Sequence, residues 1–242
     1  MTTFQPTYTV APHLTSYNLP FPTFRASNPQ YTHYVGGGLI FSRSPNLDEN
    51  GAPDTVPTGD REKSNLRILL LQRALTDSYP GAWEGPGGSC EDSDATLLSG
   101  VAREVYEETG LNVSHFVDLV AKHEWTRVKP DEVIRAVKFT FLVEVHEARD
   151  ALVSVSGDSG SLDGDEGLPA ARVGDGSVTG LARRWEEMVR LDPAEHQAFE
   201  WVGEEEILGE GGEEGKFRSF AQQGKAILEG FRILKLKGEG RG

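Results

Sequence analysis

Runs of apolar residues along the chain predict strands. The sequence YVGGGLIFSR, which starts at Tyr34, is apolar around a glycine cluster, as is typical of a strand. LRILLLQR, Leu66–Arg73, is apolar at successive positions, so it predicts a central strand that is buried on both faces. VKFTFLVEV, Val137–Val145, alternates apolar and polar residues, which predicts a strand with one buried face. AFEWV, Ala198–Val202, indicates a further strand.

Two segments have the spacing of amphipathic helices. Apolar residues recur at intervals of three and four residues over 94–109, with a polar residue among Asp92–Asp94 as the N-cap and Gly110 at the end. The same spacing predicts a last helix over roughly Lys216–Lys235. Strands that are followed by helices in this order predict a mixed α/β sandwich.

Segments rich in proline, glycine and polar residues divide the chain. Residues 1–30 are punctuated by proline and predict an extended N-terminal arm that either lies across a domain surface or frays. A long loop is predicted at 44–64, and irregular structure in YPGAWEGPGG at 79–88. Residues 151–180 hold seven Gly, five Ser and five Asp or Glu but no aromatic residue, which predicts a flexible insertion. Residues 236–242 predict a disordered tail.

Charge and cysteine content limit the classes of partner. The chain has 38 acidic and 24 basic residues, a net charge of −14 with histidine neutral, which disfavours generic nucleic-acid binding. An acidic surface that serves solubility explains most of these charges equally well. A single cysteine, the lack of a long apolar run and an N-terminus without signal-peptide features together predict a cytoplasmic protein with no membrane partner.

Three carboxylates on the first helix are candidates for chemistry. Glu104, Glu107 and Glu108 stand at i, i+3 and i+4, so they share an arc of about 100° on one helix face. A bound Mg²⁺ would convert their mutual repulsion into attraction. A solvated acidic face is the commoner explanation of such spacing, but Gly87 and Gly88 precede the helix and supply backbone that a ligand can approach closely.

The segment Gly85–Leu111 resembles the signature of the Nudix family. That signature runs Gly, five residues, Glu, seven residues, then Arg-Glu-apolar-x-Glu-Glu-x-Gly-apolar. The last nine positions, Arg103–Leu111, match in full, and WEGPGG resembles the Trp-x-x-Pro-Gly-Gly that precedes the signature in the family. Pro193–Ile207 also resembles the segment that closes many Nudix domains. The resemblance implies a Nudix hydrolase domain at 30–235, with an α/β/α sandwich around a mixed β-sheet.

One position departs from the signature, because its first glutamate is displaced. Counting back eight residues from Arg103 gives Ala95, whereas counting six residues on from Gly88 gives Asp94. The loop is therefore one residue longer than in the family pattern, and Asp94 or Glu91 is left to replace the missing carboxylate. This departure bears on the rate and the metal geometry more than on the fold.

The resemblance also implies the roles of individual residues. Glu104, Glu107 and Glu108 would ligate Mg²⁺ or Mn²⁺, and a carbonyl of Gly87 or Gly88 would complete the coordination. Arg103 would orient the carboxylates by ion pairing; the alternative is an exposed arginine.

The general base differs among Nudix proteins. Glu107 or Glu108 is therefore the first choice and Glu195 a further candidate. The dipeptide Glu195-His196 would either contact the substrate or metal, or stabilise a turn.

The implied reaction is metal-dependent hydrolysis of a diphosphate linkage in a small nucleoside diphosphate derivative or another organic diphosphate. The tryptophans Trp83, Trp125 and Trp185 would either stack on a base or pack in the core. Two alternatives remain: a non-hydrolytic sensor of a nucleotide metabolite, and an isoprenoid diphosphate isomerase, for which the single cysteine, Cys90, is misplaced. The oligomeric state is open, and a homodimer is one expectation from the resemblance.

Overall fold

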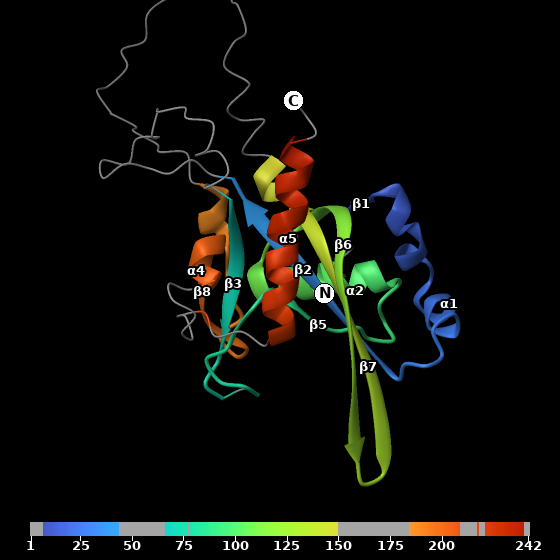
Figure 1. The fold of residues 1–242 in the computed structure, drawn as a ribbon. Coiled ribbons are helices and arrows are strands. Elements are labelled where there is room, and N and C mark those ends of the chain that lie inside the picture. The colour runs from blue at the N-terminus through green and yellow to red at the C-terminus, as the bar shows by residue number, and fades with distance from the viewer. Residues whose placement is uncertain are drawn as a thin grey trace, which may run out of the picture.

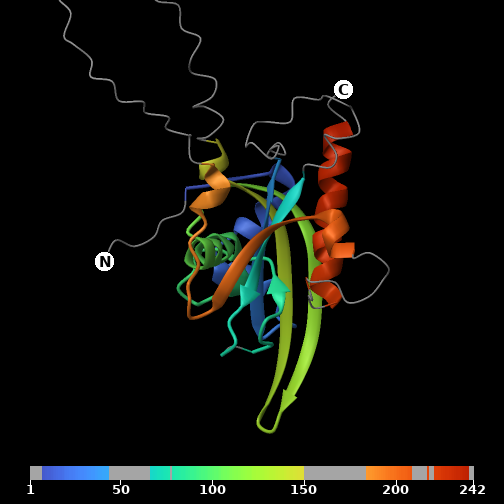
Figure 2. The same ribbon diagram turned by 90° about the vertical axis from the view of Figure 1, so that its left-hand side faces the viewer.

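The computed structural model contains three layers, with a sheet between two helices. In Figures 1 and 2 the helix α2, Leu97–Thr109, lies against one face of the sheet, and α5, Ala221–Glu239, lies against the other. This is the predicted α/β/α sandwich. The predicted loop at 44–64 and the predicted insertion at 151–180 lie outside the described residues, which are 7–43, 66–76, 78–149, 184–208, 217 and 221–239.

The sheet is mixed, as predicted. Its strand order is β1-β6-β7-β2-β3-β4, with β5 paired to β2 and β8 paired to β3. The pairs β2–β7 and β1–β6 are parallel, and the other pairs are antiparallel. The strands are β1 Thr9–Val10, β2 His33–Ser42, β3 Arg67–Arg73, β4 Trp83–Glu84, β5 Gly87–Ser89, β6 Val113–Lys129, β7 Glu132–Val145 and β8 His196–Gly203.

The remaining described helices are short. They are η1 Pro12–Asn18, α1 Phe21–Ala26, η3 Trp185–Met188 and α4 Glu204–Leu208. Among the helices of the described residues, none combines the length and the apolar character needed to cross a membrane.

The strand predictions are confirmed. In β7, more residues are buried than its alternation of apolar and polar residues indicates. In β3, the four residues Ile68–Leu71 are buried, which fits a central strand between β2 and β8. The alternating apolar residues of β7 are buried, and so are Thr140 and Leu142 on its other face. This second face is covered by α5, because Leu142 belongs to the same buried cluster as Ile227 and Phe231 of that helix. A helix on each side thus buries both faces of the sheet.

Several predicted boundaries are wrong. The helix α2 begins at Leu97 with Thr96 as N-cap, because Thr96 and Ser99 exchange hydrogen bonds in a capping box; the predicted end at Gly110 is confirmed. The segment 79–88 is not wholly irregular, since β4 and the start of β5 pair with β3 and β2.

The last helix is also displaced from its predicted bounds. Helix α5 begins at Ala221 and extends to Glu239, so the predicted tail is helical as far as that residue. Lys235 pairs with Glu204, and Lys237 pairs with Asp118 at 2.9 Å, which ties this end of α5 to the domain.

The N-terminal arm is helical rather than extended. Both η1 and α1 carry proline in their first positions, where its fixed φ favours a helical turn and its missing N–H costs nothing. Leu14, Phe21 and Phe24 are buried in the same core as α2. The N–H of Phe21 donates to the carbonyl of Ala95 at 2.9 Å, just ahead of α2. The arm is therefore part of the packing that holds α2.

Helix α2 packs very closely against β2. A Cβ at Gly36 would lie 2.4 Å from Cγ2 of Val101 on α2, which is inside any van der Waals contact distance. Val101 and Val105 are fully buried at this contact. The glycine cluster of β2 therefore sets the depth at which the carboxylate-bearing helix sits on the sheet.

We expect Leu14→Ala to lower the free energy of unfolding by about 2–5 kcal/mol, because it leaves a cavity beneath α2. Urea denaturation followed by circular dichroism measures the change. Ser16→Ala, on the exposed side of the same 3-10 helix, is the matched control and should change the stability by less than about 0.5 kcal/mol. Equal stability of both variants would contradict the integration of the arm into the core.

Candidate active site

The turn between β4 and α2 brings backbone groups to the carboxylates of the helix. Gly87 has φ of 147°, which side chains rarely adopt, and a Cβ there would lie 2.2 Å from the carbonyl oxygen of Gly36. The N–H of Gly87 donates to Oε2 of Glu108 at 2.7 Å. A Cβ at Gly88 would lie 2.4 Å from Oε2 of Glu104. The two glycines therefore hold two of the predicted ligands against the turn.

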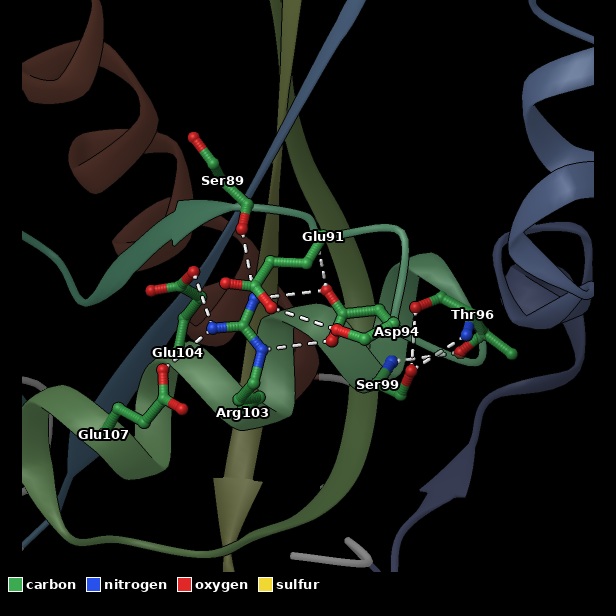
Figure 3. Close-up of polar contacts among 9 residues, drawn as sticks. Ser89, Glu91, Asp94, Thr96, Ser99, Arg103, Glu104 and Glu107 are labelled. Carbon is green, nitrogen blue, oxygen red and sulfur yellow. Dashed lines mark hydrogen bonds and ion pairs between the residues drawn. The ribbon is translucent and has the colours of Figure 1, made fainter.

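Arg103 is the centre of the polar network that Figure 3 shows. Its Nη1 donates to Glu104 at 3.0 Å and to Glu107 at 2.8 Å, and its Nη2 donates to the carbonyl of Ser89 at 3.0 Å. The side chain is 17% exposed, so the alternative of an exposed arginine is wrong. The surrounding carboxylates, Asp94 among them, raise the pKa of Arg103 although burial opposes them. A permanent cation therefore fixes the orientation of the carboxylates.

Asp94, rather than Glu91, is the acidic partner of Arg103. The two oxygens of Asp94 accept from Nε and Nη2 of Arg103 at 3.0 and 3.1 Å, and its side chain is 6% exposed. Oδ2 also accepts from the N–H of Glu91 at 2.8 Å. The Glu91 carboxylate is exposed and accepts from Ser93 at 3.0 Å. Asp94 thus orients the arginine, and its oxygens are already engaged in this network.

The structure brings the start of β8 and the residue before it to the helix. Glu108, Glu195 and His196 each offer a ligand atom, and these atoms lie within 4.8 Å of one another. His196 is 2% exposed, and neither of its ring nitrogens has a hydrogen-bond partner among the described residues. Two carboxylates beside a buried imidazole with a free nitrogen are a donor set that suits a divalent cation. Of this set, the sequence identified Glu108 directly, Glu195 as a further candidate for the general base, and the dipeptide Glu195-His196 as an open alternative between a site contact and a turn.

The predicted ligands do not all converge on this cluster. Glu104 lies against the turn beside Gly88, whereas Glu107 is 54% exposed and pairs with Arg103. Neither belongs to the group that Glu108 forms with Glu195 and His196. The acidic face of α2 therefore divides into an inner carboxylate, Glu108, and an outer one, Glu107, with Glu104 beside the turn.

A second group of charges, which the sequence analysis did not identify, lies behind the turn. Glu84 of β4 is buried and pairs with Arg73, and its Oε1 lies 3.5 Å from Nε2 of His196. Burial raises the pKa of Glu84, but His196, Lys138 and Arg73 outweigh it and hold this pKa below its usual value. Burial lowers the pKa of Lys138, which the charges of Glu84 and Glu108 partly oppose.

Only part of this second group could have been found in the sequence. Glu84 lies inside the WEGPGG motif, which was a usable signal. Lys138 occupies a polar position of an alternating strand, which normally indicates exposure to solvent.

Burial dominates the electrostatics of the helix carboxylates. It raises the pKa of Glu104 to about 7 and that of Glu108 to about 9. Arg103 opposes the shift at Glu104, and the N–H of Gly87 opposes it at Glu108, where Glu84, Glu104 and Glu195 add to it. A cation at this position would supply the missing positive charge. Burial also raises the pKa of Cys90 to about 12, so this thiol stays protonated near neutral pH.

The three tryptophans lie in different environments, so neither alternative, stacking on a base or packing in the core, holds for all of them. Trp83 is buried edge-on to Phe217, with ring centroids 5.2 Å apart. Trp185 packs edge-on to Trp201 at the same centroid distance of 5.2 Å. Trp125 is 39% exposed on β6 and is stacked on His123. Two of the three predicted candidates therefore pack against other aromatic rings, and one remains accessible.

The comparisons with known proteins agree on one domain. Residues 54–166 match the family model of the NUDIX domain. The curated m7GpppN-mRNA hydrolase NUDT17 of Danio rerio is 44% identical over 54 residues, which are 22% of this chain and 18% of that protein. The chain thus matches only a small part of this relative's length.

Solved structures that match the chain include two from microorganisms. A MutT protein from Methanosarcina mazei Go1 is 20% identical with a TM-score of 0.42, over 84% of this chain and 94% of that chain. The NUDIX domain of Shewanella oneidensis NrtR, solved with ADP ribose, is 12% identical with a TM-score of 0.46, over 83% of this chain and 87% of that chain.

We expect the stability of the metal-free protein to fall as the pH rises from about 4.5 to about 9. The folded pKa values of Glu104 and Glu108, about 7 and about 9, exceed the ordinary 4.5, so in this window the folded state holds protons that the unfolded state releases. Mg²⁺ requires the deprotonated carboxylates and should therefore raise the Tm more at high pH than at low pH. Thermal unfolding with Mg²⁺ or EDTA measures this; a Mg²⁺ shift that is independent of pH would contradict it.

We expect Asp94→Asn to lower the free energy of unfolding by about 1–3 kcal/mol, because Arg103 loses a charge-assisted pair of hydrogen bonds. Urea denaturation measures the loss. Glu91→Gln removes an equal charge from an exposed neighbour and should be nearly neutral. A larger loss from Glu91→Gln would show that the arginine depends on Glu91 instead of Asp94.

Proposed function

Because this chain belongs to the Nudix family through the domain that it carries, as its signature indicated, we propose that it hydrolyses a diphosphate linkage with the help of a divalent metal ion. The substrate would be a small nucleoside diphosphate derivative or another organic diphosphate. The observation that carries this proposal is the donor set beside the Gly87 turn, which consists of the buried Glu108 and His196 and the exposed Glu195.

The metal would be Mg²⁺ or Mn²⁺. Glu104, Glu107 and Glu108 would hold it, together with a carbonyl of Gly87 or Gly88, and Glu195 and His196 are added by their proximity to Glu108. When bound, such an ion neutralises diphosphate charge, polarises the attacked phosphorus and lowers the pKa of a coordinated water. The raised pKa values of Glu104 and Glu108 support this assignment, because burial and then the neighbouring carboxylates disfavour the charged forms that a cation would stabilise.

The chain's own residues would position and deprotonate the attacking water. Arg103 would keep Glu104 and Glu107 in fixed orientations through the bonds it donates to both. A carboxylate would accept the proton of the water. Glu107 and Glu108 are the first choices for this base. Glu195 is the third, and it is supported by its exposure beside Glu108.

The name of the curated relative supports a broad class of substrate. The curated relative is named as a hydrolase of the m7GpppN end of mRNA, which joins nucleosides through phosphoanhydride bonds. We propose the broader class, an organic group linked to a diphosphate, for this chain. A cytoplasmic location and a homodimer remain predictions of the sequence.

We expect a Mg²⁺-dependent phosphate-release screen over a panel of diphosphates to find a compound that the protein hydrolyses. EDTA should abolish the turnover, and Glu107→Gln and Glu108→Gln should each lower kcat by at least about 100-fold, because each removes a ligand or the base. Glu205→Gln, an exposed glutamate of α4, is the control and should leave kcat unchanged.

Two outcomes would contradict this function. Turnover that survives EDTA would exclude the metal-dependent reaction. If no compound is hydrolysed but one binds tightly to both the unmodified protein and Glu107→Gln, the chain is a sensor of that metabolite rather than a hydrolase.

A further inference from the structure

The β6–β7 hairpin extends well beyond the rest of the sheet. In Figures 1 and 2 its end reaches away from the other strands and from α5. The strand β2 pairs with β7 only as far as Ala136, opposite His33. Beyond that point β6 and β7 pair only with each other, to Lys129 and Glu132. This part of the hairpin, residues 123–136, is called the hairpin extension below.

One face of the hairpin extension carries aromatic and basic side chains. Residues directly opposite each other in an antiparallel pair share a face, and alternate residues of one strand do so as well. His123, Trp125, Arg127 and Lys129 therefore lie on one face of β6. The rings of His123 and Trp125 are stacked, with centroids 5.5 Å apart and planes at 18°, and the last three of these residues are exposed.

The same face continues to the candidate active site. His123 is the cross-strand partner of Lys138. Lys138 lines a small pocket with Gly85, Pro86 and Gln223, and Gly85-Pro86 leads directly into Gly87 of the metal-binding turn. Lys138 therefore lies between the two features: it pairs across the strands with His123, and it lines a pocket with the residues that lead into the turn.

The opposite face of the hairpin carries different side chains beside His123 and Trp125. There Lys122 lies over the ring of Tyr31 at 5.1 Å and pairs with Glu124 at 2.8 Å, so its charge is engaged near the N-terminal arm. Towards the tip, that face carries Val128 opposite Val133. Accessible aromatic rings beside cations thus occur on the face that leads to the turn.

We propose that this face of the hairpin extension binds the base of the substrate, so that the substrate is a nucleoside diphosphate derivative rather than an organic diphosphate without a base. The base stacks on Trp125 and His123, and the phosphate chain passes Lys138 towards the turn at Gly87. Arg127, which lies further from the turn on the same face, adds positive charge that attracts an anionic nucleotide to this part of a chain with a net charge of −14. Stacking on aromatic side chains tolerates any base, so the proposal names the class and not the base. Only the position of the diphosphate in this proposal rests on the proposed function.

The test is a binding experiment with two probes that cannot be hydrolysed at the diphosphate. One is the α,β-methylene analogue of ADP, and the other is methylenediphosphonate, which has the same bridge but no base. Isothermal titration calorimetry with Mg²⁺ gives the Kd of each probe for the unmodified chain and for Trp125→Ala, Trp125→Phe and Val128→Ala. Circular dichroism checks that each variant is folded.

We expect Trp125→Ala to weaken binding of the nucleotide analogue by about 10-fold or more and to leave methylenediphosphonate unchanged. Trp125→Phe should restore most of the affinity, since it keeps an aromatic surface. Val128→Ala changes an exposed residue of the same strand on the opposite face and should bind both probes as the unmodified chain does.

Other results separate this inference from the proposed function. Equal Kd values for the nucleotide analogue in Trp125→Ala and Val128→Ala would overturn the base-binding face, even if the screen finds hydrolysis. The base-binding face is likewise overturned if Trp125→Ala alters the sedimentation coefficient and leaves nucleotide affinity unchanged, because the face would then be an interface between copies. A Trp125-dependent Kd in a protein that hydrolyses nothing would support the face and contradict the hydrolase.

Discussion

The candidate site depends on the close approach between α2 and the glycine-rich parts of the sheet. Gly36 of β2 lies against Val101 of the helix, and Gly87 of β5 lies against the backbone of Gly36 and Gly37; a Cβ at Gly36 or at Gly87 would collide with these neighbours. Backbone at this depth can donate directly to Glu108. Larger residues would move the helix outward, since a close-packed interior has no spare volume, and the carboxylates would lose their alignment with the turn.

That close packing creates an electrostatic cost which the rest of the site relieves in part. Burial places carboxylates where their charged form is disfavoured, and this is why the pKa of Glu108 rises to about 9. Arg103 compensates the outer carboxylates, and Arg73 compensates Glu84. Glu108 has the N–H of Gly87 but no ion pair among the described residues. The inner carboxylate is thus the one that a cation would stabilise most.

The sheet connects this charged centre to surfaces far from it in the sequence. Lys138 and His123 face each other across β7 and β6, so one strand pair joins the pocket beside the turn to the exposed Trp125. Antiparallel pairing extends such a continuous face readily, because each added residue pair lengthens the same surface by a fixed step. The turn at Gly87 and the proposed base-binding face are thus separate parts of the structure that one strand pair connects.

Features that depend on local spacing could be predicted from the sequence. The strands β2, β3, β7 and β8, the α2 helix with its end at Gly110, and the shared face of Glu104, Glu107 and Glu108 follow from apolar runs and from periods of two and 3.6 residues, and the structure contains them. The strand β6 was not predicted as an element of its own. The boundaries of helices and strands were predicted less accurately. The capping box at Thr96 and the pairing of short strands such as β4 depend on contacts that cannot be predicted from the spacing of apolar residues.

Other features required the tertiary structure. The meeting of His196 with Glu108 and the covered position of Lys138 became visible only there. Strand pairing and helix cover bring these residues together across long stretches of chain, and no local pattern encodes such proximity.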